Sequence, residues 1–122
     1  MSKILVVDDD TTFIAVVRAL LEKRGYEVIA AGEGREGLEK TKSEKPDLIL
    51  LDVMMPIMDG YTMLQEVKKD EKIKDTPVIL CTGTAQKEYV EATQGMGVEA
   101  YITKPIESVS FLARVEELLK KP

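Results

Sequence analysis

Residues 48–60 read LILLDVMMPIMDG, and this stretch decides the fold of the chain. Four consecutive aliphatic residues, Leu48 to Leu51, predict a strand that is buried on both faces of a parallel sheet. Asp52 follows where that strand must leave the core, and Asp59-Gly60 marks the turn beyond it. A carboxylate in apolar surroundings needs a compensating cation or hydrogen bonds. We therefore expect the rest of the chain to supply that compensation to Asp52.

Composition excludes several classes of function. Hydrophobic residues make up 44% of the 122 residues and charged residues 32%, which is typical of one globular domain, here residues 1–122. No aliphatic run approaches membrane-spanning length and no secretory leader is recognisable, so we expect a cytoplasmic protein without membrane contacts. The net charge of -5 argues against direct nucleic-acid binding, and the absence of histidine excludes Ser-His and Cys-His catalysis and ordinary zinc sites.

Short apolar runs alternate with segments of helical periodicity along the whole chain. The predicted strands are residues 4–7, 27–31, 48–51, 78–81 and 100–103. The first predicted helix begins after Asp10 or Thr11 and stops at Gly25, the second covers 34–43, Asp59 caps the third, and the fourth and fifth cover 86–94 and 111–119. This alternation predicts an α/β fold, a doubly wound five-stranded parallel sheet with five helices on its two faces.

Several of these elements have specific packing expectations. The second helix has little apolar surface besides Leu38, and the third should bury Tyr61, Leu64 and Val67. The fourth helix is only thinly amphipathic, so we expect it to be the least firmly held. The single cysteine, Cys81, lies within an apolar strand and should behave as a small buried hydrophobe.

Polar groups follow the ends of four of the five strands. In an open parallel sheet such groups meet beyond the carboxyl ends of the strands, and here they are Asp8, Asp9, Asp52, Thr82 and Lys104. Three carboxylates about 5 Å apart repel by roughly 3 kcal/mol per pair at an effective dielectric near 20. A divalent cation bound between them makes the net electrostatic energy of the cluster favourable. Hard oxygen ligands suit Mg2+. The set predicts phosphoryl transfer, with Asp52 as nucleophile and Lys104 and Thr82 stabilising the equatorial oxygens.

Over its whole length the chain resembles a response-regulator receiver domain of two-component signalling, similar to the CheY-like single-domain type. The matching residues are the pair Asp8-Asp9 after VV, Asp52 in LLDVMMPIMDG, Thr82 after a strand, and Lys104-Pro105. The resemblance implies a flavodoxin-like strand order of 2-1-3-4-5. It also implies a cis Lys104-Pro105 peptide, which suits a tight turn that reaches back toward Asp52.

The resemblance further implies a role for each matching residue. Asp52 would be the phosphoacceptor. Asp9, Asp52 and the main-chain carbonyl of Met54 would bind Mg2+, which Asp8 would reach mainly through water. Thr82 and Tyr101 would form a switch pair, although a tyrosine on a predicted buried strand is by default a core aromatic.

Two further positions bear on how long the phosphoryl group would last. In the family, the residues that correspond to Met54 and Thr84 flank the path of the hydrolytic water. Neither side chain is a carboxylate or amide that could orient water, so we expect slow self-dephosphorylation.

The partners follow from the same reasoning. Because the chain has no histidine, the phosphohistidine donor must be another protein, a histidine kinase or a phosphotransfer protein, unless a small phosphodonor serves. The resemblance implies an effector that binds the surface of the fourth helix, fifth strand and fifth helix, and a monomer or phosphorylation-dependent dimer. We expect a signalling domain rather than an enzyme, either a single-domain regulator or part of a longer kinase or transcription regulator.

Other functions fit the residues less well. A flavin-binding module shares the architecture, but three aspartates in its first loop would repel a phosphate. An aspartyl-phosphate phosphatase would need a second carboxylate two positions after Asp52, where the chain has Met54. The spacing of Met55 and Met58 could suggest a soft metal, but thioethers without Cys or His nearby favour turn and core packing.

Overall fold

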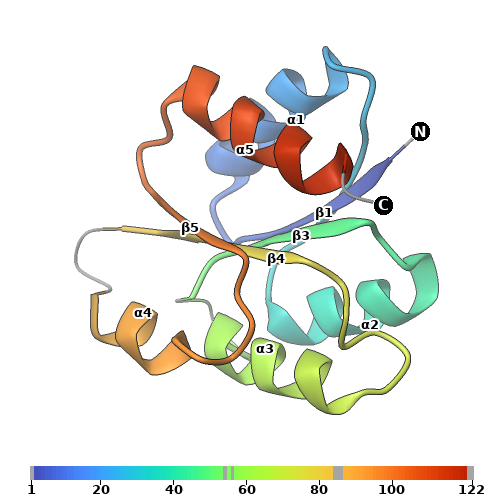
Figure 1. Cartoon of the computed structure of the whole chain (residues 1–122), viewed down its shortest axis with the longest axis vertical. Helices are drawn as coiled ribbons and strands as arrows, with labels where there is room; N and C mark the ends of the chain where they lie inside the picture. Colours follow the sequence, from blue (N-terminus) through green and yellow to red (C-terminus); the bar gives the residue numbers. More distant parts are fainter. Residues whose placement is uncertain (1, 54, 56, 84–86, 121–122) are drawn as a thin grey trace.

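The computed structural model describes residues 2–53, 55, 57–83 and 87–120, and in this part of the chain five β-strands alternate with five α-helices (Figure 1). Each predicted strand is found within one residue of its expected bounds. The fourth helix ends one residue before its expected end, and its expected first residue, Gln86, lies outside the described residues. The elements in chain order are β1 (Lys3–Val7), α1 (Thr11–Glu22), β2 (Glu27–Ala31), α2 (Gly34–Glu44), β3 (Leu48–Leu51), α3 (Gly60–Lys69), β4 (Val78–Thr82), α4 (Lys87–Thr93), β5 (Ala100–Thr103) and α5 (Ser108–Lys120).

The strands form one parallel sheet in the order β2-β1-β3-β4-β5, which confirms the predicted fold class and strand order. The inner strands β1, β3 and β4 are buried along almost their whole length, because helices cover both faces of the sheet. In the register of the sheet Val7 pairs with Leu51, and Thr82 pairs with Thr103. The residues that follow the strands therefore emerge together at one edge.

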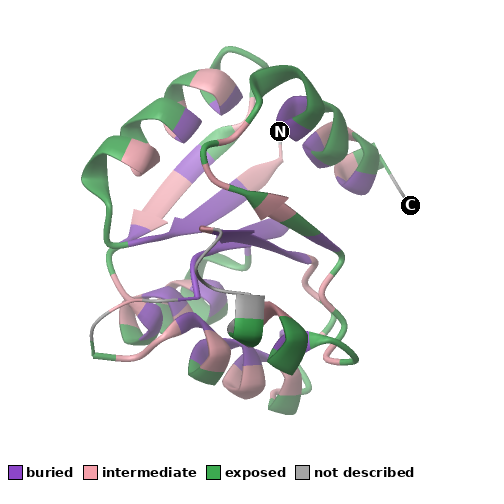
Figure 2. Cartoon of the chain, turned by 90° about the vertical axis from the view of Figure 1, so that its left-hand side faces the viewer, coloured by how far each residue is buried: buried purple, intermediate pink, exposed green. Residues whose placement is uncertain are grey.

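The helices form two layers around the sheet. In Figure 1, α1 and α5 cover one face, and α2, α3 and α4 cover the other. Figure 2 shows that the buried residues of these helices lie on the sides turned toward the sheet. Leu21 and Phe111 belong to the core of the first face, and Met63 and Leu64 belong to the core of the second. Each such side chain stabilises the fold by about 1.5–3 kcal/mol, so both faces hold the strand ends in place.

Helix α2 packs through small residues rather than through the predicted Leu38. Leu38 is only partly buried, whereas Gly34, Gly37 and Thr41 are buried. A Cβ atom on Gly37 would lie 2.9 Å from Val7 and from the sulfur of Met63, so the absence of a side chain lets α2 approach the sheet closely. The prediction was incomplete because a count of apolar residues does not register an interface made of glycine.

Helix α3 begins where the sequence predicts, but its buried face differs. The Asp59 side chain accepts a hydrogen bond from the backbone N–H of Thr62 at 2.7 Å, as an N-cap residue does. Leu64 is buried as predicted, whereas Tyr61 is only half-buried and Met63 takes the core position. The expectation for Tyr61 was therefore wrong. Residues three or four positions apart share a helix face, and Met63 and Val67 fit that face better than Tyr61 does.

The remaining local predictions concern the ends of elements and one thiol. Asp10 caps α1, and Gly25 has the positive φ of 86° expected at its stop. The Lys104-Pro105 peptide is cis, as predicted. Cys81 is buried, and desolvation raises the pKa of its thiol to about 12.

Among the described residues, no helix is both long and apolar enough to cross a bilayer.

Candidate functional site

The backbone of the sheet positions the predicted site residues beyond the ends of their strands. The N–H of Asp8 donates to the carbonyl of Ala31 at 3.0 Å, and the N–H of Asp52 donates to the carbonyl of Val7 at 3.0 Å. The N–H of Lys104 likewise donates to the carbonyl of Thr82 at 2.7 Å. These bonds tie each residue to a neighbouring strand. The site is therefore built on the rigid end of the sheet rather than on free loops.

Three carboxylates meet at this end of the sheet, as the sequence predicts. Asp8, Asp9 and Asp52 each offer an oxygen atom, and these atoms lie within 4.8 Å of one another. Asp8 is 1% exposed and Asp52 is 5% exposed, whereas Asp9 faces solvent. At such separations like charges repel by roughly 3 kcal/mol per pair at an effective dielectric near 20, so the cluster requires positive charge.

Lys104 supplies part of that charge. Its Nζ atom donates a hydrogen bond to Oδ2 of Asp8 at 2.7 Å and lies 3.7 Å from Oδ2 of Asp52. Burial alone would lower the pKa of Lys104, but the hydrogen bond to Asp8 and the negative charges of Asp52 and Asp8 outweigh burial and raise it. The ammonium group is thus held charged between two buried carboxylates.

The donor set suits a hard divalent cation. Oxygen ligands from one exposed and two buried carboxylates match what Mg2+ accepts, with positions left for water or phosphoryl oxygen. Asp8, Asp9 and Asp52 could therefore hold the ion together. Met54, whose main-chain carbonyl the resemblance adds to this set, lies outside the described residues, as does Thr84.

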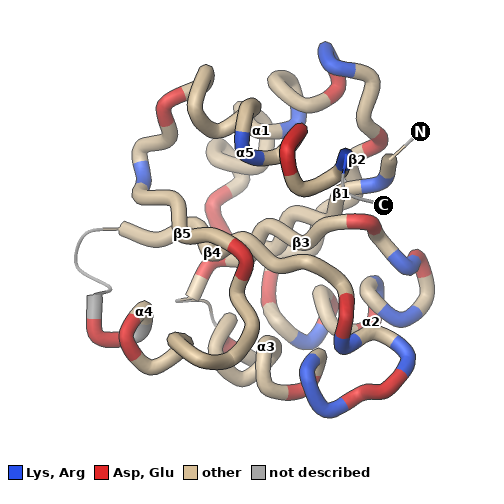
Figure 3. The backbone as a smooth tube through the Cα atoms, in the orientation of Figure 1, with Lys and Arg blue, Asp and Glu red and all other residues tan. Residues whose placement is uncertain are grey.

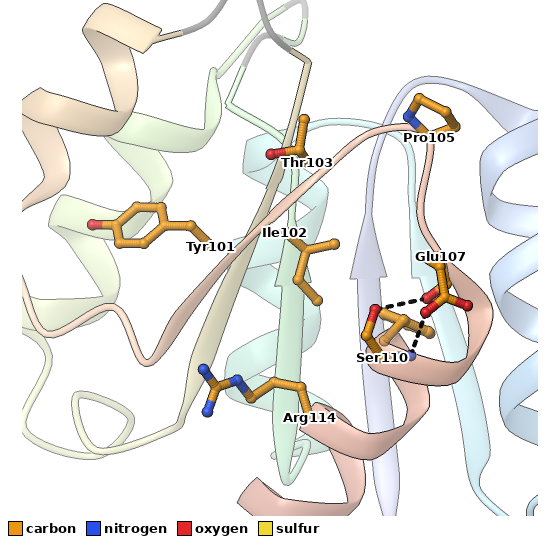
Figure 4. Close-up of a pocket in the computed structure, with 8 residues that line it drawn as sticks. Tyr101, Ile102, Thr103, Pro105, Glu107, Ser110 and Arg114 are labelled. Atoms are coloured by element: carbon orange, nitrogen blue, oxygen red, sulfur yellow. Dashed lines mark hydrogen bonds between the residues drawn. The ribbon is translucent and has the colours of Figure 1, made fainter.

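The predicted switch pair is placed on two neighbouring strands. Thr82 ends β4 and is buried, whereas Tyr101 on β5 is 39% exposed, so the default expectation of a core aromatic was wrong. The reason is the position of β5 at the edge of the sheet. Figure 4 shows the Tyr101 side chain pointing from β5 toward α4. Its hydroxyl lies 3.1 Å from Oγ1 of Thr93, the last residue of α4.

Sequence reasoning missed two contacts, one at the acidic site and one beside the predicted switch pair. The Nζ atom of Lys104 lies 4.3 Å from the centre of the Phe13 ring, a cation–π contact worth about 0.5–1 kcal/mol or more. Thr93, fully buried, donates its hydroxyl proton to the carbonyl of Val90 at 2.7 Å, so the Tyr101 hydroxyl must be the donor to Thr93. Helical periodicity assigns Phe13 to the core, and it carries no signal for a contact with a residue some ninety positions away.

Fold and site together define an open α/β sheet protein with an acidic centre, at the carboxyl ends of its strands, that could hold a cation. A sequence model described as "Response regulator receiver domain" matches residues 4–116. The chain belongs to this family, the receiver domains of two-component response regulators.

Individual relatives agree with that assignment. The chain is 38% identical to the DNA-binding dual master transcriptional regulator RpaA of Synechocystis, over 99% of this chain and 50% of that protein. It is 33% identical to the protein PilH of Pseudomonas aeruginosa, over 98% of both. The crystal structure of a CheY-like receiver domain protein from Methanospirillum hungatei superposes with a TM-score of 0.89 at 34% identity, covering 98% of this chain and 94% of that one. The chain thus spans about half the length of RpaA and nearly all of PilH.

Proposed function

We propose that this receiver domain accepts one phosphoryl group on Asp52, from the phosphohistidine of a histidine kinase or phosphotransfer protein or from a small phosphodonor. The observation that supports this best is the buried carboxylate of Asp52 beside Lys104, with Asp8 and Asp9 close by. A phosphoryl group needs positive charge around its oxygens, and this arrangement provides both an ammonium and a set of ligands for a cation.

The chemistry requires few groups. An Oδ atom of Asp52 attacks phosphorus and forms a P–O bond while the P–N bond of the phosphohistidine breaks. The electron pair of that bond stays on the imidazole nitrogen, which takes up a proton. Lys104 is close enough to Asp52 to pair with a phosphoryl oxygen. When bound, Mg2+ would supply further positive charge to these oxygens, and Asp8, Asp9 and Asp52 would hold it.

In this proposal the chain catalyses its own phosphorylation and a slow dephosphorylation, and it turns over no substrate. The acidic turn at Asp8 to Asp10 still argues against a flavin phosphate at the same place. The position two residues after Asp52 is Met54, which cannot serve as the acid or base of a phosphatase.

Intact-mass spectrometry tests the proposal directly. After incubation with acetyl phosphate and Mg2+, we expect one added phosphate per chain, and after removal of Mg2+ with a chelator we expect none. Failure of the protein to take up phosphate with Mg2+ present would contradict the proposal. Uptake at the same rate in chelator would contradict the role of the metal alone.

The surface beside the site supports a protein as the donor. A cavity of about 420 Å³ next to Lys104 is lined mainly by apolar groups, among them Phe13, Val16, Pro105 and Ile106. Val16 is about half exposed although it is apolar. Exposed apolar groups that border a charged site are typical of surfaces that bind another protein. We propose that the phosphodonor docks here.

For the effector we propose the surface formed by α4, β5 and α5. A cavity of about 310 Å³ lies on this surface, between β5 and the start of α5, with Tyr101, Ile102, Phe111 and Arg114 in its lining (Figure 4). The hydrogen bond from Tyr101 to Thr93 joins β5 to α4. A change at Thr82 that moved Tyr101 would break this bond and alter the surface.

Nuclear magnetic resonance can follow this readout. With Mg2+ and beryllofluoride, which stands in for the phosphoryl group, we expect the largest amide shifts between Thr82 and Lys104. The reason is that Tyr101 and α4 are coupled through Thr93, so movement of one disturbs the other. Shifts confined to residues that touch Asp52 would argue against a switch on this surface.

The lifetime of the phosphorylated state gives a further prediction. Met54 and Thr84 lack the carboxylate or amide that would orient the attacking water, so replacing them together with Asn and Glu should speed the loss of phosphate about tenfold. That factor corresponds to about 1.4 kcal/mol in the barrier. Phosphate loss would be followed with Mg2+ present. A double variant that decays no faster than wild type would show that these side chains do not set the rate.

Three other expectations remain proposals. Figure 3 shows Lys and Arg interspersed with Asp and Glu along α2 and the segment after α3. This mixture and the net charge of -5 support a chain that does not itself bind DNA. A cytoplasmic location and a monomer or phosphorylation-dependent dimer remain predictions.

A further inference from the structure

An isoleucine near the site combines two unfavourable properties. Ile57 has a positive φ of 67°, and its side chain is 74% exposed. A left-handed backbone is uncommon for any residue except glycine and is a genuine outlier for a β-branched one. With most of the side chain in solvent, its burial contributes little against this strain. Strain of this kind at an exposed position points to a function outside the fold.

The surrounding backbone fixes where Ile57 lies. The N–H of Gly60 donates to the carbonyl of Val53 at 2.8 Å, and the N–H of Gly34 donates to the carbonyl of Met58 at 2.8 Å. Asp59 is tied to the start of α3 as its N-cap. The segment that leaves Asp52 is therefore anchored directly after Ile57, which projects into solvent five residues from the predicted phosphoacceptor.

We propose that Ile57 is a recognition residue, an apolar contact for the protein that carries the phosphohistidine. This inference rests on the proposed function. The donor histidine must lie outside these 122 residues because they contain none, and Asp52 is 5% exposed, so a donor group has to enter a nearly closed site. A protein that delivers this group must contact the surface around Asp52. The apolar cavity beside Lys104 and the exposed Ile57 then provide two apolar contacts for it.

The test separates contact from strain with three variants. Ile57→Asn removes the apolar side chain and tolerates a positive φ, so it should raise Tm by about 3 to 6 °C. Ile57→Leu keeps an apolar side chain without β-branching. Lys45→Asn is the matched control, because Lys45 also has a positive φ, of 47°, but precedes β3 at the opposite end of the sheet.

The measurement is the ratio of two phosphorylation rates for each variant. One rate is transfer from the autophosphorylated kinase that labels wild type fastest among all histidine kinases of the source genome, and the other is uptake from acetyl phosphate. We expect this ratio to fall about tenfold or more in Ile57→Asn and to change less than twofold in Ile57→Leu and in Lys45→Asn.

Each outcome decides the matter. An unchanged ratio in Ile57→Asn overturns the inference, and so does labelling by acetyl phosphate with none by any kinase. An equal fall in Ile57→Leu also overturns it, because the backbone conformation rather than the apolar contact would then matter. If wild type takes up phosphate neither from acetyl phosphate nor from any kinase, the proposed function itself fails.

Discussion

Replacing Asp52 with Asn is expected to abolish phosphoryl uptake, by a factor of at least about a thousand, or roughly 4 kcal/mol in the barrier. Asn has nearly the same shape, so the fold should persist, but its neutral amide oxygen is a poor nucleophile toward phosphorus. The change also removes one of the three carboxylates that could hold the cation. Uptake from acetyl phosphate with Mg2+ would be measured by intact mass, with circular dichroism to confirm folding.

A matched control lies in the neighbouring acidic turn. Asp10 is exposed and accepts hydrogen bonds from the N–H groups of Thr12 and Phe13 as the N-cap of α1. Asn is an equally good N-cap residue, so Asp10→Asn should keep both stability and uptake. Phosphate uptake that persisted in Asp52→Asn would show that another carboxylate, such as Asp9, is the acceptor, and peptide mapping would identify it.

The fold could be predicted almost completely because each strand is followed by residues typical of a turn and then by a segment in which apolar residues recur at helical spacing. The errors have a common physical origin. Apolar periodicity shows where large side chains are buried, but it does not show a close approach made by glycine, as at Gly37 of α2. It also cannot tell an edge strand from an inner one, and so Tyr101 of β5 proved to be exposed.

The candidate site could be predicted as a set of residues but not as a set of contacts. Strand ends in a parallel sheet meet at one edge, so Asp8, Asp52 and Lys104 could be assigned to one place from their positions in sequence. Which carboxylate Lys104 contacts more closely depends on side-chain conformation. The hydrogen bond goes to Asp8 at 2.7 Å, and Asp52 remains at 3.7 Å.

Of the substitutions that add a single methyl group near the site, Gly60→Ala is expected to be the most destabilising. An added Cβ would overlap the carbonyl oxygen of Asp52 and lie 2.9 Å from Cα of Val53. These neighbours are backbone atoms, and the N–H of Gly60 donates a hydrogen bond to the carbonyl of Val53 at 2.8 Å. Neither the backbone at Gly60 nor that of Asp52 and Val53 can therefore shift without disturbing this hydrogen bond. We expect a loss of about 3 to 5 kcal/mol in the free energy of unfolding and a fall in Tm of roughly 10 to 20 °C.

Urea unfolding measures this loss, and Gly32→Ala is its control because the nearest atom to an added Cβ there is 3.8 Å away. Gly32→Ala should remain within about 1 kcal/mol of wild type. Because the clash in Gly60→Ala is with the carbonyl of Asp52, its relief must move either the start of α3 or the backbone of the residue proposed to accept phosphate. The folded fraction of Gly60→Ala should therefore also take up phosphate more slowly. A Gly60→Ala protein as stable as Gly32→Ala would show that the start of α3 is not held against the end of β3.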